Sequence, residues 1–139
     1  MLRKIISMRF LLLGISAFLV LMSCNTKKVD AKFKADWVYK NASTHKIEVR
    51  SRANFTLTSG QTHSIFEEGE GSKNIKPENY VSPQWGAETI IIVDDGNEYI
   101  LSKGESITEV MNYEAEKIKH NYYRFTYTFT DEILQSFKD

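Results

Sequence analysis

The segment YYRFTYTFT, residues 122–130, alternates between two kinds of side chain. Its odd positions are aromatic, and its even positions from Arg124 onward are hydrophilic. Successive side chains of a β-strand point to opposite faces of a sheet, so this pattern predicts a strand with one buried face and one wet face. An aromatic stripe could also form a ligand platform, but at strand spacing it is more often core. We therefore expect the aromatic face to pack.

Other alternating runs predict that most of the chain is β-structure. Turn residues separate two such runs at each of three places, which predicts hairpins over 37–50, 55–66 and 88–101, with turns at Asn41–Thr44, Gly60-Gln61 and Asp95-Gly96. The run 90–93 is apolar on both faces and indicates a central strand.

Helical signals are few. Thr130-Asp131-Glu132, followed by apolar residues at helical spacing, predicts a short C-terminal helix. Ser106 and Glu109 form a capping-box pattern, so residues 105–120 are either a helix or a loop. Together the elements predict an all-β fold, an antiparallel β-sandwich of about seven strands with a short C-terminal helix; a small barrel is the alternative.

The first 23 residues have the plan of a signal peptide. Arg3, Lys4 and Arg9 precede an apolar run over 10–22. Thirteen residues make about 20 Å of helix, which is short of the roughly 30 Å hydrocarbon core of a bilayer. We expect a cleaved leader over 1–23, a lipidated Cys24 with a flexible Lys-rich tether over 24–34, and a sandwich domain over 35–139.

Cys24 is the only cysteine of the chain. The sequence Leu-Met-Ser-Cys that ends at Cys24 resembles the bacterial lipobox. That resemblance implies a diacylglyceryl group on the thiol and cleavage before Cys24. Two or three acyl chains, at about 0.8 kcal/mol per buried methylene, would hold the protein permanently on a membrane. The alternative is a free buried cysteine near the end of a leader.

Charge and thiol content exclude several classes of function. The leader carries three of the 18 basic residues and none of the 18 acidic ones, so the mature chain has a net charge of about minus three. Nucleic-acid binding would need a basic stripe or patch, which this composition does not indicate. With Cys24 acylated, disulfides, thiol catalysis and Cys-based zinc sites are excluded as well.

Candidate chemistry is scarce in this sequence. His45, His63 and His120 lack the spacing of a metal site, and we expect them at the surface or at sheet edges. Asp94 and Asp95 could be imagined as a glycosidase pair, but adjacent strand residues point to opposite faces and Asp-Gly is a turn signal. We expect no enzyme activity, no metal and no cofactor.

Residues 69–86 form the longest expected connection, and they contain both prolines and three glycines. This segment also carries Tyr80, Val81 and Trp85, whose apolar side chains need cover. In one interpretation they fold back and close one end of the core. In the other, Trp85, with or without Tyr80, stays partly exposed and contacts a ligand or partner.

Four features carry a resemblance to known proteins: the Ser-Cys-Asn junction of the leader, VYKNASTHKI, the DDG turn, and YTFT followed by Asp-Glu. With them the chain resembles small uncharacterised lipoproteins of Gram-negative gut anaerobes. The resemblance implies a lipid-anchored all-β domain in the outer membrane, with no catalytic residues to transfer. Similar lipoproteins carry acidic surface-export signals where this chain is Lys-rich, so the periplasmic face and the cell surface both stay open.

Two functions follow as hypotheses. The first is a lipid-anchored binding module that presents the Trp85 and Tyr80 loop to a glycan, a peptide or an envelope protein. The second is a structural accessory subunit that packs on an envelope complex through a sheet edge or face. Neither hypothesis specifies the oligomeric state.

We predict that Cys24 is acylated in the mature protein. Cys24→Ser removes the sulfur nucleophile, so the precursor should remain uncut, or be released without lipid if it is cleaved elsewhere. Mass spectrometry of the mature N-terminus measures this. An unmodified Cys24 in protein purified from membranes would contradict the prediction.

Overall fold

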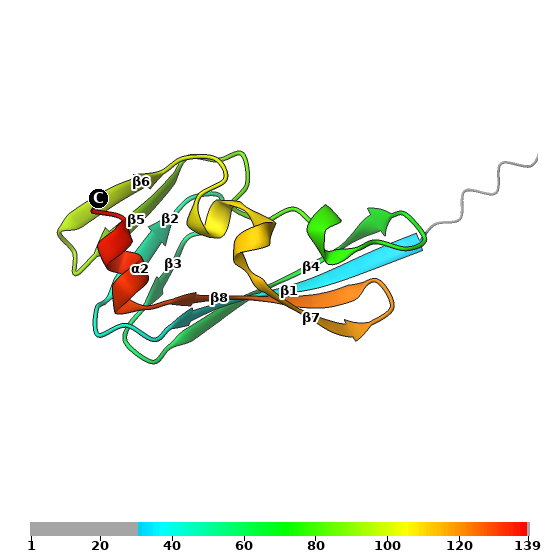
Figure 1. Cartoon of the computed structure of the whole chain (residues 1–139), viewed down its shortest axis with the longest axis horizontal. Helices are drawn as coiled ribbons and strands as arrows, with labels where there is room; N and C mark the ends of the chain where they lie inside the picture. The colour runs from blue at the N-terminus through cyan, green and yellow to red at the C-terminus, as the bar shows by residue number, and fades with distance from the viewer. Residues whose placement is uncertain (1–30, 139) are drawn as a thin grey trace, which may run out of the picture.

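The computed structural model describes residues 31–138. These residues form two β-sheets that enclose one hydrophobic core (Figure 1). The predicted leader over 1–23, Cys24 and tether residues 25–30 lie outside the described residues. The predicted all-β sandwich is confirmed, with eight strands rather than about seven. Residues 31–138 contain no helix that is both long enough and apolar enough to span a membrane.

The two sheets have four strands each. The long sheet has the order β4-β1-β8-β7 and consists of β1 (Ala31–Asn41), β4 (Thr62–Gly71), β7 (Glu114–Lys119) and β8 (Tyr122–Phe129). The short sheet has the order β3-β2-β5-β6 and consists of β2 (Ile47–Arg50), β3 (Phe55–Leu57), β5 (Thr89–Val93) and β6 (Asn97–Leu101). All paired strands are antiparallel except β1 and β8, which are parallel.

The aromatic face of β8 forms the centre of the core, as its alternation predicted. Phe125 and Phe129 are fully buried, and Tyr127 is buried as well. The ring of Phe125 stacks on Trp37 of β1 at 4.4 Å between centroids. Thr126, on the opposite face, is only half-buried.

One of the three predicted hairpins is present. β5 and β6 pair over their full length, and β5 is a central strand, as predicted. Their turn places Asp94 and Asp95 at φ 53° and 59°, the left-handed region that a type I′ turn requires at both central positions. The turn is thus centred on Asp94 and Asp95 and not on the predicted Asp95-Gly96; Gly96 donates to the backbone oxygen of Val93 and closes it.

The other two predicted hairpins are wrong, because their strands lie in different sheets. The chain crosses from β1 to β2 through residues 42–46, and from β3 back to β4 through residues 58–61. Asn41 holds the two crossings together: its side-chain amide donates to the carbonyl oxygens of His45 and Leu57 at 2.7 and 3.1 Å. Alternation fixes the face on which a residue lies, but it does not select the partner strand.

β1 begins at Ala31, within the range expected for the tether. Residues 31–34 are paired with the end of β4, and they place Lys32 and Lys34 within 3.4 and 3.2 Å of Glu68. Gly69 and Gly71, expected in an irregular loop, belong to β4. A Cβ on Gly69 would lie 2.6 Å from the ring of Phe33, so the glycine makes room for that ring.

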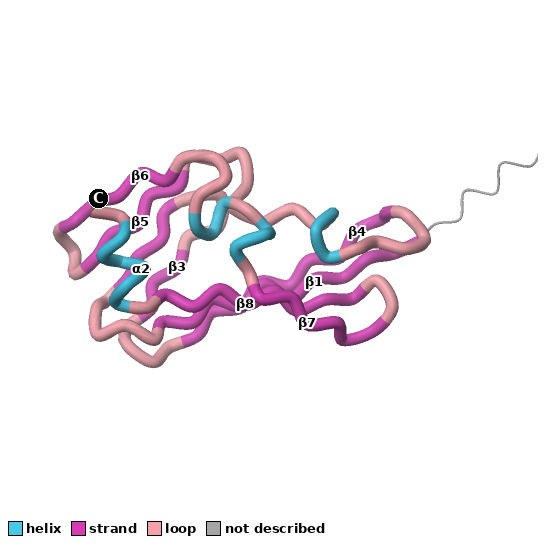
Figure 2. The backbone as a smooth tube through the Cα atoms, viewed as in Figure 1, coloured by secondary structure: helices cyan, strands magenta, loops and turns pink. Residues whose placement is uncertain are grey.

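Residues 105–120 are neither a helix nor a simple loop. They form two 3-10 turns, η2 (Ser106–Thr108) and η3 (Val110–Asn112), followed by β7. Together with η1 (Pro77–Asn79), these turns lie along the part of the long sheet that the short sheet leaves uncovered (Figure 2). The predicted C-terminal helix is confirmed as α2 (Asp131–Ser136), where Thr130 caps the N-terminus by accepting from the N–H of Ile133.

The register of β8 can be tested by truncation. Phe125→Ala should lower the free energy of unfolding by about 3–5 kcal/mol through lost burial and a cavity. Thr126→Ala should cost under about 1 kcal/mol, because its side chain is only half-buried. Chemical denaturation of both variants measures the difference, and equal losses would contradict the assignment of the two faces.

Candidate functional site

The segment that follows β4 covers the inner face of the long sheet where that sheet extends past the short one. Asn121, in the turn between β7 and β8, holds this segment in place. Its side chain accepts from the N–H of Ile75 at 3.0 Å and donates to the carbonyl oxygens of Ser72 and Lys73, both at 3.2 Å. Asn121 adopts φ 52°, a left-handed conformation that asparagine tolerates better than most residues.

A groove of about 610 Å³ opens between this segment and β4. We call it the loop groove. Phe33, Ile75 and Tyr80 form its apolar floor. Its rim holds the exposed Val81 and the charged side chains of Arg52 and Glu70. Its volume lies within the usual range of about 300–1,000 Å³ for small-ligand sites. Residues 69–86, the longest connection expected from the sequence, therefore supply much of the groove lining.

The two charges on the rim are unpaired within residues 31–138. Arg52 comes from the β2–β3 connection and Glu70 from β4, and neither has an ion-pair or side-chain hydrogen-bond partner there. A third charge, Glu67, also lines the groove but accepts from the indole N–H of Trp37 at 2.9 Å. Arg52 and Glu70 are thus available to a ligand that carries charges of both signs.

Tyr80 contributes to the floor of the loop groove rather than to a free aromatic surface. Only 5% of the residue is exposed, and its ring packs against Phe33, Tyr123 and Phe125. Its hydroxyl donates to the backbone oxygen of Asn121 at 2.9 Å. Burial raises the pKa of this phenol above its ordinary value. For Tyr80 the structure therefore matches the interpretation in which the loop folds back.

Trp85 lies outside the loop groove and remains 40% exposed. Its position is set by the preceding residue: the buried side chain of Gln84 donates to the backbone oxygen of Ala53 at 3.1 Å. The ammonium group of Lys103 lies 4.8 Å from the Trp85 ring centroid, a cation–π contact that covers one face of the ring. The structure does not bring Trp85 and Tyr80 together in one site.

A second, larger groove of about 950 Å³ runs along β6, and we call it the edge groove. One wall is β6, the edge strand of the short sheet, with Glu98 and Ile100. The other wall includes Tyr127, Ile133 and Phe137. Ile100 is 69% exposed. Because β6 pairs only with β5, one row of its backbone groups has no strand partner.

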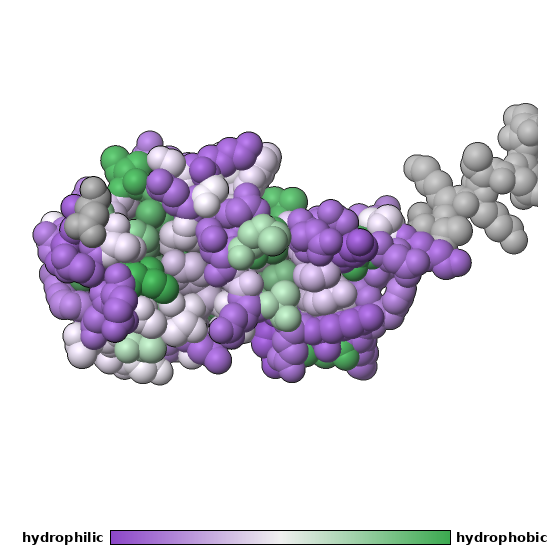
Figure 3. Space-filling model, viewed as in Figure 1, coloured by the Kyte–Doolittle hydropathy of each residue, from purple (hydrophilic) through white to green (hydrophobic). Residues whose placement is uncertain are grey.

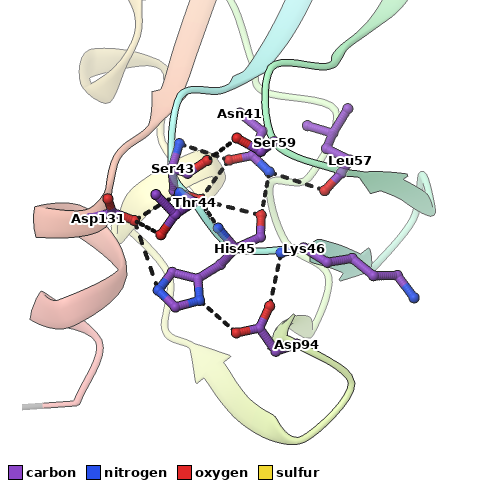
Figure 4. A network of polar contacts seen from close by, with 9 residues as sticks. All are labelled: Asn41, Ser43, Thr44, His45, Lys46, Leu57, Ser59, Asp94 and Asp131. Atoms are coloured by element: carbon purple, nitrogen blue, oxygen red, sulfur yellow. Dashed lines mark hydrogen bonds and ion pairs between the residues drawn. The ribbon is translucent and has the colours of Figure 1, made fainter.

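His45 is the centre of a polar network that joins both sheets and α2 (Figure 4). Its Nδ1 contacts the Asp94 carboxylate at 2.5 Å, and its Nε2 lies 3.8 Å from Asp131. Asp94 also accepts from the N–H of Lys46, and Asp131 from the N–H of Thr44, both at 3.0 Å. The hydrogen bond to His45, followed by that to Lys46, holds the pKa of Asp94 below its ordinary value. No local sequence pattern predicts this network, because its members lie up to 87 residues apart.

The other candidate residues each contact neighbouring groups of the fold. Asp95 forms an ion pair with Lys46 at 2.8 Å, while His63 stacks on Phe55 and His120 contacts the backbone oxygen of Lys73. Residues 31–138 contain no group of three or more His, Cys, Asp and Glu side chains that could hold a metal ion. Searches of family models, curated proteins and solved structures gave no match to this chain.

Asp94→Asn should make the stability of the protein less dependent on pH. The lowered pKa means that the Asp94 carboxylate stabilises the fold above its ordinary value of 3.8, and that this contribution disappears as the pH falls through the folded value. The variant should therefore melt below the parent at neutral pH and converge with it in acid. Thermal melts across this range measure the effect. Asp95→Asn is the control, because Asp95 has no contact with His45; an identical profile for that variant would contradict the assignment.

Proposed function

We propose that this protein is a lipid-anchored lipoprotein of the outer membrane. The support is the order of the leader: basic residues, an apolar run, and Ser-Cys at the point where that run ends. β1 begins seven residues after Cys24, so an acyl group there would keep the folded domain within about 25 Å of the lipid surface.

Its function in this proposal is to bind an extended peptide segment of another envelope protein in the loop groove. The observation that carries the proposal is the apolar floor between two unpaired charges of opposite sign, Arg52 and Glu70. A peptide supplies apolar and charged side chains within a few residues of each other. A segment with one apolar residue between a basic and an acidic one would complement this groove.

The geometry favours a peptide over a glycan. Sugar recognition by stacking needs an open aromatic face. Tyr80 is buried, and one face of Trp85 is covered by Lys103. Neutral sugars would also leave Arg52 and Glu70 without a charged partner. A binding role also accounts for the loop groove without any catalytic residue, and we propose no enzyme activity and no cofactor.

Selection from a library of displayed peptides tests this proposal. The protein used is the chain starting at Asn25, because residues 31–138 contain the core and leave no buried side-chain polar atom there without a partner. The parent should enrich peptides with an apolar residue flanked by both charges. Arg52→Glu should shift the preference at the acidic peptide position towards basic residues, and Glu70→Lys should do the reverse. Lys40→Glu, on an exposed residue at the far end of β1, is the matched charge-reversal control.

Three results would distinguish the alternatives. If no peptide is enriched, or if the enriched peptides are the same for the parent and both charge variants, the loop groove is not the binding site. Retention on a glycan array that is lost in Trp85→Ala would favour a glycan ligand. Crosslinking in intact cells from position 100, with none from position 81, would favour the accessory role. The exposed Ile100 beside the free edge of β6 is the observation that supports that second candidate.

A further inference from the structure

Three segments that are distant in sequence meet where β1 begins. Ala31 pairs with Gly71 at the end of β4, and Lys34 pairs with Tyr122 beside the β7–β8 turn. Asn121 joins all three through hydrogen bonds with Lys34, Ser72 and Lys73. We call this part of the molecule the β1 end; it comprises residues 31–34, 71–76 and 117–121. In Figure 1 it lies opposite α2.

The β1 end is rich in lysine. Lys73 and Lys76 lie in the segment after β4, and Lys117 and Lys119 lie on β7. All four are exposed, and none has a carboxylate oxygen within 4.0 Å among residues 31–138. Lys32 and Lys34 add two more charges, which share Glu68. Figure 3 shows that the surface at this end is largely hydrophilic.

The opposite end of the molecule carries four carboxylates, three of which contact His45 or Lys46. Asp94 and Asp95 lie in the β5–β6 turn, and Asp131 and Glu132 begin α2. The mature chain as a whole is slightly acidic, with about three more acidic than basic residues. Within residues 31–138, the fold therefore places four lysines without a carboxylate partner at one end of an acidic protein, beside Glu68 and the unpaired Glu70.

We propose that the β1 end rests on the phosphate-bearing headgroups of the membrane to which Cys24 is anchored. This inference rests on the lipid anchor proposed above. Only six residues separate Cys24 from Ala31, so the β1 end stays within about 25 Å of the headgroups. Electrostatic attraction to a charged surface is screened beyond about 8 Å at physiological ionic strength. A linker of six residues lets the β1 end approach the headgroups to within this distance. Lys27 and Lys28 of the tether add to the same charge.

Contact through the β1 end fixes the orientation of the domain. Asn121 holds the backbone around Lys32 and Lys73 in one arrangement, so the lysines are presented on a rigid surface. α2 and the β5–β6 turn then point away from the membrane, and their carboxylates avoid its negative charge. The edge groove, which α2 helps to line, points away with them.

Vesicle binding by the unlipidated chain starting at Asn25 tests this inference. It should bind phosphatidylglycerol-containing vesicles at low ionic strength and dissociate from them at high salt. It should not bind vesicles of pure phosphatidylcholine. Each lysine near an anionic surface contributes about fivefold in affinity. Replacing Lys73 and Lys76, or Lys117 and Lys119, with Gln should therefore weaken binding by about 25-fold. The matched control replaces Lys40 and Lys138, which lie outside the β1 end, and it should bind like the parent.

Several results would overturn the inference. Binding that does not depend on phosphatidylglycerol, or an equal loss in the control pair, would show that the β1 end has no special role. Binding of a DNA duplex as tight as that of vesicles would mean that the lysines form a general polyanion site. The lipid anchor is measured separately by mass spectrometry of Cys24. An acylated Cys24 without lysine-dependent vesicle binding would refute this inference and leave the anchor standing. An unmodified Cys24 together with lysine-dependent vesicle binding would refute the anchor and leave the lipid-binding surface standing.

Discussion

The parallel pairing of β1 with β8 is the contact on which the rest of the structure depends. It joins the first and the last strand of the described chain over eight residue pairs, from Lys34 with Tyr122 to Asn41 with Phe129. Parallel strands cannot be joined by a tight turn, so the whole intervening chain must return to the same end of the sheet before β8 begins. The short sheet, the long loop and β7 are all part of that return.

This pairing also assembles the core. It places Trp37 and Phe125 side by side, and Tyr113 packs edge-on against the same indole at 5.2 Å. The core contains several hydroxyl groups, whose burial without partners would be costly. Tyr113 donates to the backbone oxygen of Ile107 at 2.8 Å, and Ser82 donates to the same oxygen at 2.6 Å. Burial raises the pKa of Tyr39 to about 12, which keeps this phenol neutral over the physiological range.

The same topology explains why candidate functional surfaces collect where they do. The long sheet extends past the short sheet, and the segment after β4 covers the part of its inner face that the short sheet does not reach. The loop groove forms where this cover ends. Asn121 connects this loop to the start of β1. One residue, Asn121, buried at the turn between β7 and β8, therefore binds both the segment that lines the groove and the backbone at Lys32, Lys34 and Lys73.

The sequence alone determined most of the strand segments and the buried face of β8, since both follow from side-chain periodicity and turn residues within a few positions. It predicted the aromatic face of β8, the central strand β5, the β5–β6 hairpin, although with its turn one residue late at Asp95-Gly96, and the cap of α2 at Thr130. Only the tertiary structure decided which strands pair, because backbone hydrogen bonds carry no record of side-chain identity. In the structure β2 and β3 pair in a different sheet from β1 and β4. Residues 114–119 form an edge strand, and residues 31–34, expected in the tether, pair with β4. The candidate sites depended on the tertiary structure too: Arg52 and Glu70 line one groove, and His45 meets Asp94 and Asp131, only after distant segments pack.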